Sequence, residues 1–127
     1  VDATVLGLGL YGFIKMDDPR FIGTIEAVEK ELLYKECLYR YHREDSLPGI
    51  EGAFVITSLW MVECYWKSGR KDDARSMLKA LRSAIGKTGI MAEQIDPDSG
   101  GSLGNLAQCY SHLGYINTVL AMASDND

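Results

Sequence analysis

Hydrophobic positions along the chain follow two kinds of helical pattern, which alternate. Residues 2–14, 51–67 and 106–122 are apolar on nearly every side, whereas residues 19–33 and 71–85 carry one apolar stripe at helical spacing and charged side chains elsewhere. A helix that is apolar all round is expected to be buried on all sides, and an amphipathic helix keeps one face in water. The order inner, outer, inner, outer, inner predicts an all-α domain of helical hairpins in two layers.

Capping residues set the expected boundaries of these helices. Asp2 is suited to cap the first helix, and Asp18 followed by Pro19 is a helix-start signal with proline at the first position. Gly69 suits the end of the third helix. Five helices do not close a ring, so the sequence predicts an open arc, or a ring completed by another chain or by a missing upstream segment. The chain also starts at Val1 without an initiator methionine, as expected for a processed form or a piece of something longer.

Two long loops are expected to follow the amphipathic helices and to meet at one end of the inner layer. Residues 34–50 are expected to be a loop with a short extended piece at residues 37–41. Residues 89–112 form a longer irregular segment, in which Glu93 lies before a dense turn signal at residues 96–101. Long loops in compact domains usually serve a site, so the sequence predicts an active-site loop with Glu93 at its neck. The alternative is that Glu93 only caps or solvates the loop.

Composition narrows the class of protein. The chain of 127 residues, 46% hydrophobic and 24% charged, is typical of one globular domain spanning residues 1–127. Its formal net charge of -5 argues against binding to nucleic acid, and it has no apolar run long enough to cross a membrane. Three widely spaced cysteines without a CxxC motif predict neither a disulfide framework nor a zinc site, but reduced thiols in a cytoplasmic protein. No metal or other cofactor is expected.

Three segments that together cover most of the chain carry a resemblance to a known family. They read DATVLGLGLYGFIKMDDPRFIGTIEAVEKEL, LYRYHREDSLPGIEGAFVITSLWMVE and MAEQIDPDSGGSLGNLAQCYSHLGYIN. They resemble, in this order, the C-terminal part of the catalytic domain of glycoside hydrolase family 15. The members of this family are glucoamylases, glucodextranases and the trehalases of some bacteria and archaea.

The resemblance implies a fold and a reaction. The fold is an (α/α)6 barrel, of which the expected helices would be the last part, an incomplete toroid. The reaction is hydrolysis of α-glucosidic bonds with inversion, in which a carboxylic acid protonates the leaving oxygen and a carboxylate activates water from the opposite face. The implied partners are an α-glucan, an oligosaccharide or trehalose, together with the remainder of the barrel or a self-associated copy.

The resemblance also implies roles for three acids. Glu93, in Ala92-Glu93-Gln94, matches the family's general base. The family's general acid belongs to an earlier segment that this chain does not contain, so the chain alone is expected to be inactive. Glu51 resembles the glutamate of the family's PGxEGAF turn and is expected to line the site. Glu63 lies within an inner helix, where a paired structural acid is the favoured interpretation.

Other residues match sugar-binding positions of the family. Arg40 and Asp45 resemble its sugar-binding arginine and aspartate, a pair that suits the hydroxyl groups of a glucose ring. Tyr110 is expected either to stack on a sugar or to pack. His112 is either a structural histidine or a ligand contact. The sequence departs from the family at 106–107, where Leu-Ala replaces the usual Phe-Pro, and this changes the expected shape of the pocket.

Two classes of function are open at this point. The first is a sugar hydrolase that needs further protein, with Glu93 as its base. The second is a helical-repeat module that binds other proteins without catalysis. The helix pairs lack a fixed repeat period and have unequal loops, which counts against a repeat. The hydrolase interpretation predicts that Glu93, Arg40 and Asp45 converge at one concave end of the inner helices.

Overall fold

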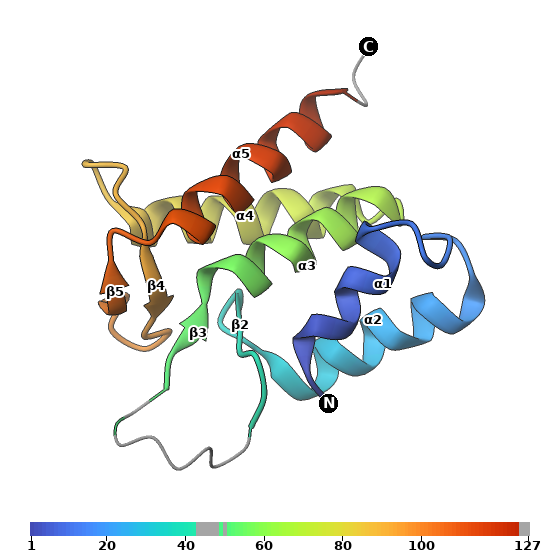
Figure 1. The fold of residues 1–127 in the computed structure, drawn as a ribbon, viewed down its shortest axis with the longest axis horizontal. Coiled ribbons are helices and arrows are strands. Elements are labelled where there is room, and N and C mark those ends of the chain that lie inside the picture. The colour runs from blue at the N-terminus through green and yellow to red at the C-terminus, as the bar shows by residue number, and fades with distance from the viewer. Residues whose placement is uncertain (43–48, 50, 125–127) are drawn as a thin grey trace.

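The computed structural model describes residues 1–42, 49 and 51–124 (Figure 1). Helices dominate this part of the chain, and its strands are short. In chain order, the elements are η1 (Ala3–Leu6), α1 (Gly7–Leu10), α2 (Pro19–Leu32), β1 (Leu33–Tyr34), β2 (Cys37–Leu38), β3 (Ala53–Phe54), α3 (Val55–Lys67), α4 (Lys71–Ile85), β4 (Ala92–Ile95), β5 (Ser102–Leu106) and α5 (Cys109–Ser124).

The predicted all-α class is wrong, because two small antiparallel sheets accompany the helices. β1 pairs with β2 in a hairpin, and a second sheet has the strand order β3-β4-β5. Both segments predicted to be loops contain strands, of which β2 lies within the extended piece predicted at residues 37–41, and the fold is mixed α/β. Strands of two to five residues are too short to give a recognisable alternation, and β3 finds its partner β4 far along the sequence.

Helix α3 forms the centre of the core. Ten of its 13 residues are buried, and α4, α5, α1 and η1 all contact it. The two amphipathic helices, α2 and α4, bury one stripe each, as predicted. The buried side chains are Phe21, Ile25, Val28 and Leu32 in α2 and Ala74, Met77 and Leu81 in α4.

The first helix differs from its prediction in length and in burial. Asp2 does cap it, because its carboxylate accepts a hydrogen bond from the Thr4 N–H at 2.8 Å. The α-helical part ends at Leu10, and Gly12 soon follows with φ of 77°, a left-handed value that disfavours any side chain. One face of this segment is buried, but its large apolar side chains Leu8, Tyr11 and Phe13 are exposed. Burial on all sides was therefore a wrong prediction for this helix.

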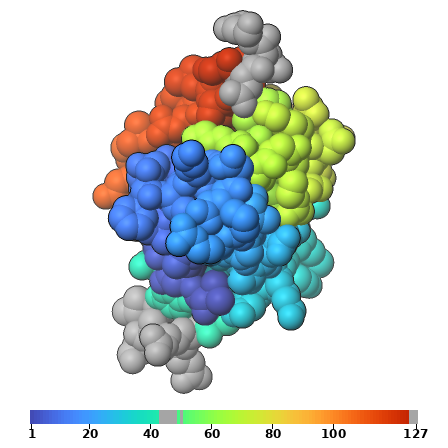
Figure 2. All heavy atoms as spheres, turned by 90° about the vertical axis from the view of Figure 1, so that its right-hand side faces the viewer, coloured from blue at the N-terminus to red at the C-terminus, as the bar shows by residue number. Residues whose placement is uncertain are grey.

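Helix α5 is also less buried than predicted. It packs on α3 through three small residues, Ser111, Gly114 and Thr118, and these are its buried residues. Three of its large apolar side chains, Leu113, Ile116 and Leu120, are more than half exposed, while Tyr115 and Met122 pack against the core. Figure 2 shows α5, in orange and red, and the blue N-terminal residues on the same side of the molecule. No helix in the described part of the chain is long and apolar enough to cross a membrane.

The strands gather at one end of the molecule. β3 leads directly into the N-terminus of α3, the β4–β5 hairpin pairs with β3, and β2 contacts β3 (Figure 1). The start of α5 follows β5 at the same end. Segments that are far apart in the sequence therefore meet around the first turn of the buried helix.

Candidate functional site

Glu93 lies on β4, in a hairpin rather than in the irregular loop that the sequence predicted. The β4–β5 pairing joins Ala92 to Leu106 and Gln94 to Leu103, and its register shifts between Ala92 and Gln94. Glu93 is the residue at this irregularity. The extra residue lies on β5, because Gly104 and Asn105 together stand opposite Glu93, and such bulges are common beside functional sites.

A cavity of about 320 Å³ opens beside Glu93. Three predicted site residues line it: Arg40 from the segment after β2, Glu93 from β4, and Tyr110 from the first turn of α5. The rest of the lining combines an apolar wall with a few polar groups, namely Phe54, Ile56 and Trp60 together with Thr4, Thr57, Gln108 and Ser111. The cavity therefore has the apolar wall and the few convergent polar groups that characterise small-ligand sites.

The Glu93 carboxylate is held by one neighbour on the opposite strand. Its Oε2 accepts a hydrogen bond from the backbone N–H of Asn105 at 3.0 Å and a second from the Asn105 side-chain Nδ2 at 2.9 Å. Glu93 is only partly buried. A partly buried carboxylate at a cavity is suited to accept a proton from a bound water.

Arg40 is tied to the N-terminal segment. Its backbone carbonyl accepts a hydrogen bond from the Ala3 N–H at 2.8 Å, and its Nε lies 3.9 Å from Asp2 Oδ2. The guanidinium is about half exposed, so it keeps donors for a ligand. Asp45, its predicted companion, lies outside the described residues.

Glu51 is half-buried and stands next to the cavity's sheet, but it is not among the described residues that line the cavity. Its neighbour Gly52 donates its N–H to Gln94 Oε1 at 2.8 Å. A Cβ on Gly52 would lie 2.7 Å from the Ile95 carbonyl oxygen, so only glycine permits this approach. The Gln94 side chain thus fixes the backbone beside Glu51 to the strand that carries Glu93.

Two residues at the start of α5 hold β4 in place. The Ser111 hydroxyl donates to the Ala92 carbonyl at 2.7 Å, and this contact is buried. His112 Nε2 accepts from the Met91 N–H at 3.3 Å, while its Nδ1 lies 2.8 Å from the Gln108 carbonyl and donates to it. Both ring nitrogens of His112 therefore bind backbone groups, which favours its structural interpretation over a ligand contact.

Glu63 is a paired structural acid, as predicted. It is buried in α3, where its Oε1 accepts a hydrogen bond from the Thr118 hydroxyl at 3.1 Å. Its Oε2 lies 3.4 Å from Lys67 Nζ, one turn further along the same helix. These contacts link α3 to α5 and leave Glu63 no part in the cavity.

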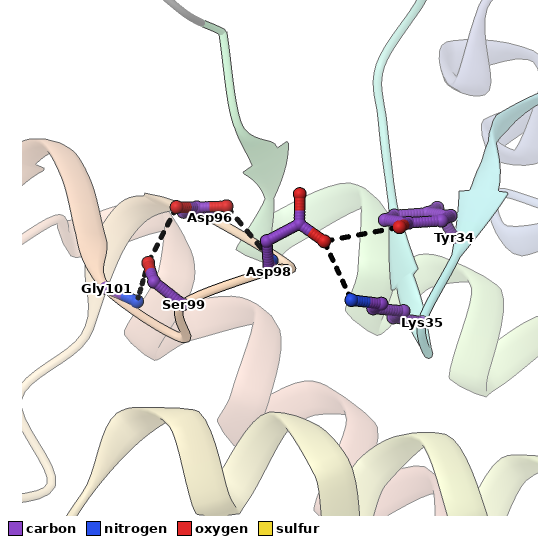
Figure 3. A network of polar contacts seen from close by, with 6 residues as sticks. All are labelled: Tyr34, Lys35, Asp96, Asp98, Ser99 and Gly101. Atoms are coloured by element: carbon purple, nitrogen blue, oxygen red, sulfur yellow. Dashed lines mark hydrogen bonds and ion pairs between the residues drawn. The ribbon is translucent and has the colours of Figure 1, made fainter.

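Side-chain contacts also join the tip of the β4–β5 hairpin to the β1–β2 turn (Figure 3). Asp98 accepts hydrogen bonds from Lys35 Nζ at 2.7 Å and from the Tyr34 hydroxyl at 3.2 Å. Asp96 accepts from the Asp98 N–H at 3.0 Å and from the Ser99 hydroxyl at 2.6 Å. These bonds lower the pKa of Asp98, mainly through Lys35, and that of Asp96, mainly through Ser99. The network supports the hairpin on which Glu93 lies.

Two residues of the site were not predicted from the sequence: Trp60, which lines the cavity, and Asn105, which binds Glu93 without lining it. Trp60 was assigned to a helix buried on all sides, and Asn105 was taken as part of an irregular loop. The sequence signal near Asn105 is the preceding Gly104, which has φ of 71° in the structure and lies at the irregularity in the β4–β5 pairing. Trp60 gives no such signal, because its sequence surroundings are uniformly apolar.

Potential metal ligands and cysteines are dispersed over the described residues. Within residues 1–42, 49 and 51–124, no group of three or more histidine, cysteine, aspartate or glutamate side chains could hold a metal ion. All three cysteines are free: Cys37 and Cys64 are buried, and Cys109 is exposed. Burial raises the pKa of the Cys64 thiol to about 12, so it stays protonated.

Comparison with known proteins gives the class to which this fold and cavity belong. The family model for glycosyl hydrolases family 15 matches residues 1–120. The chain belongs to this family. No solved structure matches the chain.

Curated relatives are much longer than this chain. It is 38% identical over 117 residues to a trehalase of Thermoplasma volcanium, covering 91% of this chain and 19% of the relative. It is 40% identical over 117 residues to a trehalase of Thermoplasma acidophilum, covering 91% of this chain and 20% of the relative. It is 36% identical over 123 residues to a trehalase of Mycobacterium tuberculosis, covering 94% of this chain and 18% of the relative. The chain thus spans about a fifth of the length of these relatives.

Proposed function

We propose that this chain supplies the general base and part of the sugar site of an enzyme that hydrolyses α-glucosidic bonds with inversion. The observation that carries the proposal is the single cavity lined by Glu93, Arg40 and Tyr110, which come from three separate segments. Membership of glycosyl hydrolases family 15 supports the reaction class. Trehalose is the proposed substrate, because the relatives described above are trehalases.

Glu93 acts in the proposed reaction as the group that accepts a proton from water. The water oxygen forms a bond to the anomeric carbon as the glycosidic bond breaks, and its proton passes to the Glu93 carboxylate. The leaving oxygen takes a proton from a carboxylic acid on the opposite face of the sugar. In an inverting pair the two carboxyl groups stand about 6.5 to 9.5 Å apart, which leaves room for the water. We assign that acid to protein outside this chain.

Arg40 and Tyr110 hold the sugar in this proposal. Arg40 presents a half-exposed guanidinium whose N–H groups donate to ring hydroxyls. Tyr110 is 68% exposed and borders the same cavity, so its ring is available to stack on a sugar face. Asp45 and Glu51 remain candidates for further sugar contacts.

The exposed apolar residues of α1 and α5 support the proposal that more protein completes the site. Monomeric soluble proteins rarely expose large contiguous apolar patches. Leu8 on α1, Phe13 in the segment after it, and Leu113 and Ile116 on α5 are exposed, and both helices pack on α3. We propose that the remainder of the catalytic domain, or a second copy of the chain, covers them. The isolated chain is then expected to lack activity.

The test is hydrolysis of trehalose by the full-length protein that carries this sequence, with maltose and isomaltose as competing substrates. Proton NMR at early times should show equal amounts of β-glucose and α-glucose, because inversion converts the attacked unit to β while the leaving glucose keeps its α configuration; α-glucose alone would indicate retention. Glu93→Gln should lower kcat by about 10² to 10⁴-fold, because it removes the proton acceptor while keeping the shape of the side chain. Glu26→Gln, an exposed position on α2, is the matched control. Near-normal turnover by Glu93→Gln would remove Glu93 from the reaction.

A further inference from the structure

The two hydrogen bonds to Glu93 are unevenly shared between its carboxylate oxygens. The Asn105 backbone N–H and the Asn105 side-chain amide both donate to Oε2, at 3.0 and 2.9 Å. One residue therefore fixes one oxygen from two directions. A carboxylate bound in this way cannot rotate freely about its last bond, and the second oxygen, Oε1, takes a defined direction.

The backbone beside Asn105 is shaped to allow this contact. Gly104 has φ of 71°, a value in the left-handed region. A Cβ on Gly104 would lie 2.7 Å from Glu93 Oε2 and 3.1 Å from Glu93 Cβ, so a side chain there would displace the carboxylate. Glycine thus gives Glu93 the space, and the next residue along the chain supplies both donors.

We propose that Asn105 is a positioning residue for the general base, which fixes Glu93 Oε2 so that Oε1 faces the attacking water. This inference rests on the proposed function. Asn105 neither takes up nor releases a proton in the reaction. The water proton passes to Oε1, the water oxygen bonds to the anomeric carbon, and the leaving oxygen receives its proton from the acid on the other face.

A positioning role predicts a specific kinetic pattern. Asn105→Ala removes the Nδ2 bond, while its backbone N–H still donates to Oε2. The base remains present but is less well oriented, and misplacement of a reacting group by about 1 Å can cost on the order of 10²-fold in rate. We expect kcat to fall by about 10 to 100-fold, with KM changed by less than about threefold, because Asn105 does not bind the sugar.

Two further variants separate positioning from packing. Asn105→Asp keeps the shape of the side chain but replaces the amide donor with an acceptor, so it should lose at least as much kcat as Asn105→Ala. Gly104→Ala should lower kcat by displacing the carboxylate while leaving Asn105 unchanged. Ser102→Ala, an exposed residue on the same strand, is the matched control and should keep the wild-type kcat.

A second substrate distinguishes the base side of the reaction from the acid side. Fluoride leaves α-glucosyl fluoride with little need for protonation, yet its hydrolysis still requires an activated water. The Asn105 variants should therefore lose the same factor in kcat on α-glucosyl fluoride as on trehalose. Recovery on the fluoride would show that Asn105 acts on the leaving-group side and would overturn the inference.

The full-length protein, its Glu93→Gln variant and the Asn105 variants are measured together. Near-normal kcat in Glu93→Gln overturns the proposed function and this inference with it. A large loss in Glu93→Gln with less than a twofold change in Asn105→Ala overturns the inference alone. A raised KM with unchanged kcat also overturns the inference alone, since it identifies a sugar contact.

For any variant that unfolds, NMR of the Asn105 backbone and side-chain amides in the wild type and in Glu93→Gln replaces kinetics. Unchanged resonances would contradict the bonds to Glu93.

Discussion

Helices α3 and α5 have equally apolar sequences but opposite positions in the structure. Of the 13 residues of α3, ten are buried, including Glu63 with its partners. In α5, which has 16 residues, the buried ones are small or polar, and large side chains such as Leu113 and Leu120 are exposed. The two helices lie against each other, so they share one contact but not one environment.

The difference shows that an apolar sequence pattern predicts a helix with a hydrophobic surface, but not which neighbours bury that surface. α3 meets neighbours on all sides within this chain. α5 contacts α3 on one face, and much of its remaining apolar surface is exposed in the described part of the chain. The N-terminal segment is similar, with Leu8 exposed on α1 and Tyr11 and Phe13 exposed just after it. Both segments therefore expose apolar side chains that the proposed remainder of the catalytic domain would cover.

Truncating a leucine in each helix is the strongest test of this comparison. Leu59 on α3 is fully buried, so Leu59→Ala should lower the free energy of unfolding by about 2 to 5 kcal/mol. Leu120 on α5 is 59% exposed, and Leu120→Ala should cost about 0.5 kcal/mol or less. Urea unfolding of the dilute chain, followed by circular dichroism, measures both. Equal losses would mean that α5 is covered in solution.

The close approach of α5 to α3 gives the next largest effect. A Cβ on Gly114 would lie 2.5 Å from Ile56 Cδ1 and 3.2 Å from Leu59 Cδ1, so Gly114→Ala should push the helices apart and cost about 1 to 3 kcal/mol. Gly23→Ala is the matched control, because nothing lies within 4 Å of its Cβ position on exposed α2. It should stabilise by about 0.5 to 1 kcal/mol through helix propensity. Thermal unfolding decides the sign of each change.

An ion pair between Arg70, just after α3, and Glu29 on α2 anchors the C-terminal end of α3. Among the described contacts, α5 has no corresponding ion pair. Arg70 donates to Glu29 at 2.6 and 2.9 Å, and these bonds lower the pKa of the Glu29 carboxyl. A lowered folded-state pKa contributes stability above the ordinary value of 4.5, and this contribution disappears as the pH falls through the lower value. Glu29→Gln should cost about 1 kcal/mol at neutral pH and progressively less in acid.

The control for Glu29→Gln is Glu26→Gln, which lies on the exposed side of α2. Subtracting the two variants' unfolding free energies across pH removes the contributions of other carboxyl groups. If the difference stayed constant below pH 4, the Arg70 contact would have no part in the stability of α3.

A charge on the exposed face of α5 should have the smallest effect on stability. Ile116 is 51% exposed, so Ile116→Lys should change the free energy of unfolding by about 0.5 kcal/mol or less. It should nevertheless weaken association with any partner that covers this face. Sedimentation at increasing concentration measures this, with Ser76→Lys on α4 adding the same charge elsewhere. Equal sedimentation of both variants and the wild type would exclude self-association through α5.

The sequence was informative where contacts are local. The periodic stripes of α2 and α4 and the cap at Asp2 were predicted correctly, because helix period and capping depend on residues close in the chain. Family motifs brought attention to Glu93, Arg40 and Tyr110, which the structure places at one cavity. Their roles in catalysis and binding remain predictions.

The sequence was uninformative where contacts are distant. β3 consists of Ala53 and Phe54, and it becomes a strand only because β4 lies beside it. The helix predicted from residue 51 therefore begins at Val55. In the same way, the Asn105 bonds to Glu93 depend on a bulge in the pairing of β4 with β5. No periodicity within a single segment encodes such pairs.

The hydroxyl group of Ser111 links helix α5 to the strand that carries Glu93. Ser111 lies on the α5 face that packs on α3, and its buried bond at 2.7 Å ends on the carbonyl of Ala92, the residue before Glu93. Any partner that presses α5 inward or draws it outward consequently acts on the strand that bears the carboxylate. If the proposed assembly forms through α5, association at this helix and the position of the Glu93 carboxylate would then be thermodynamically linked.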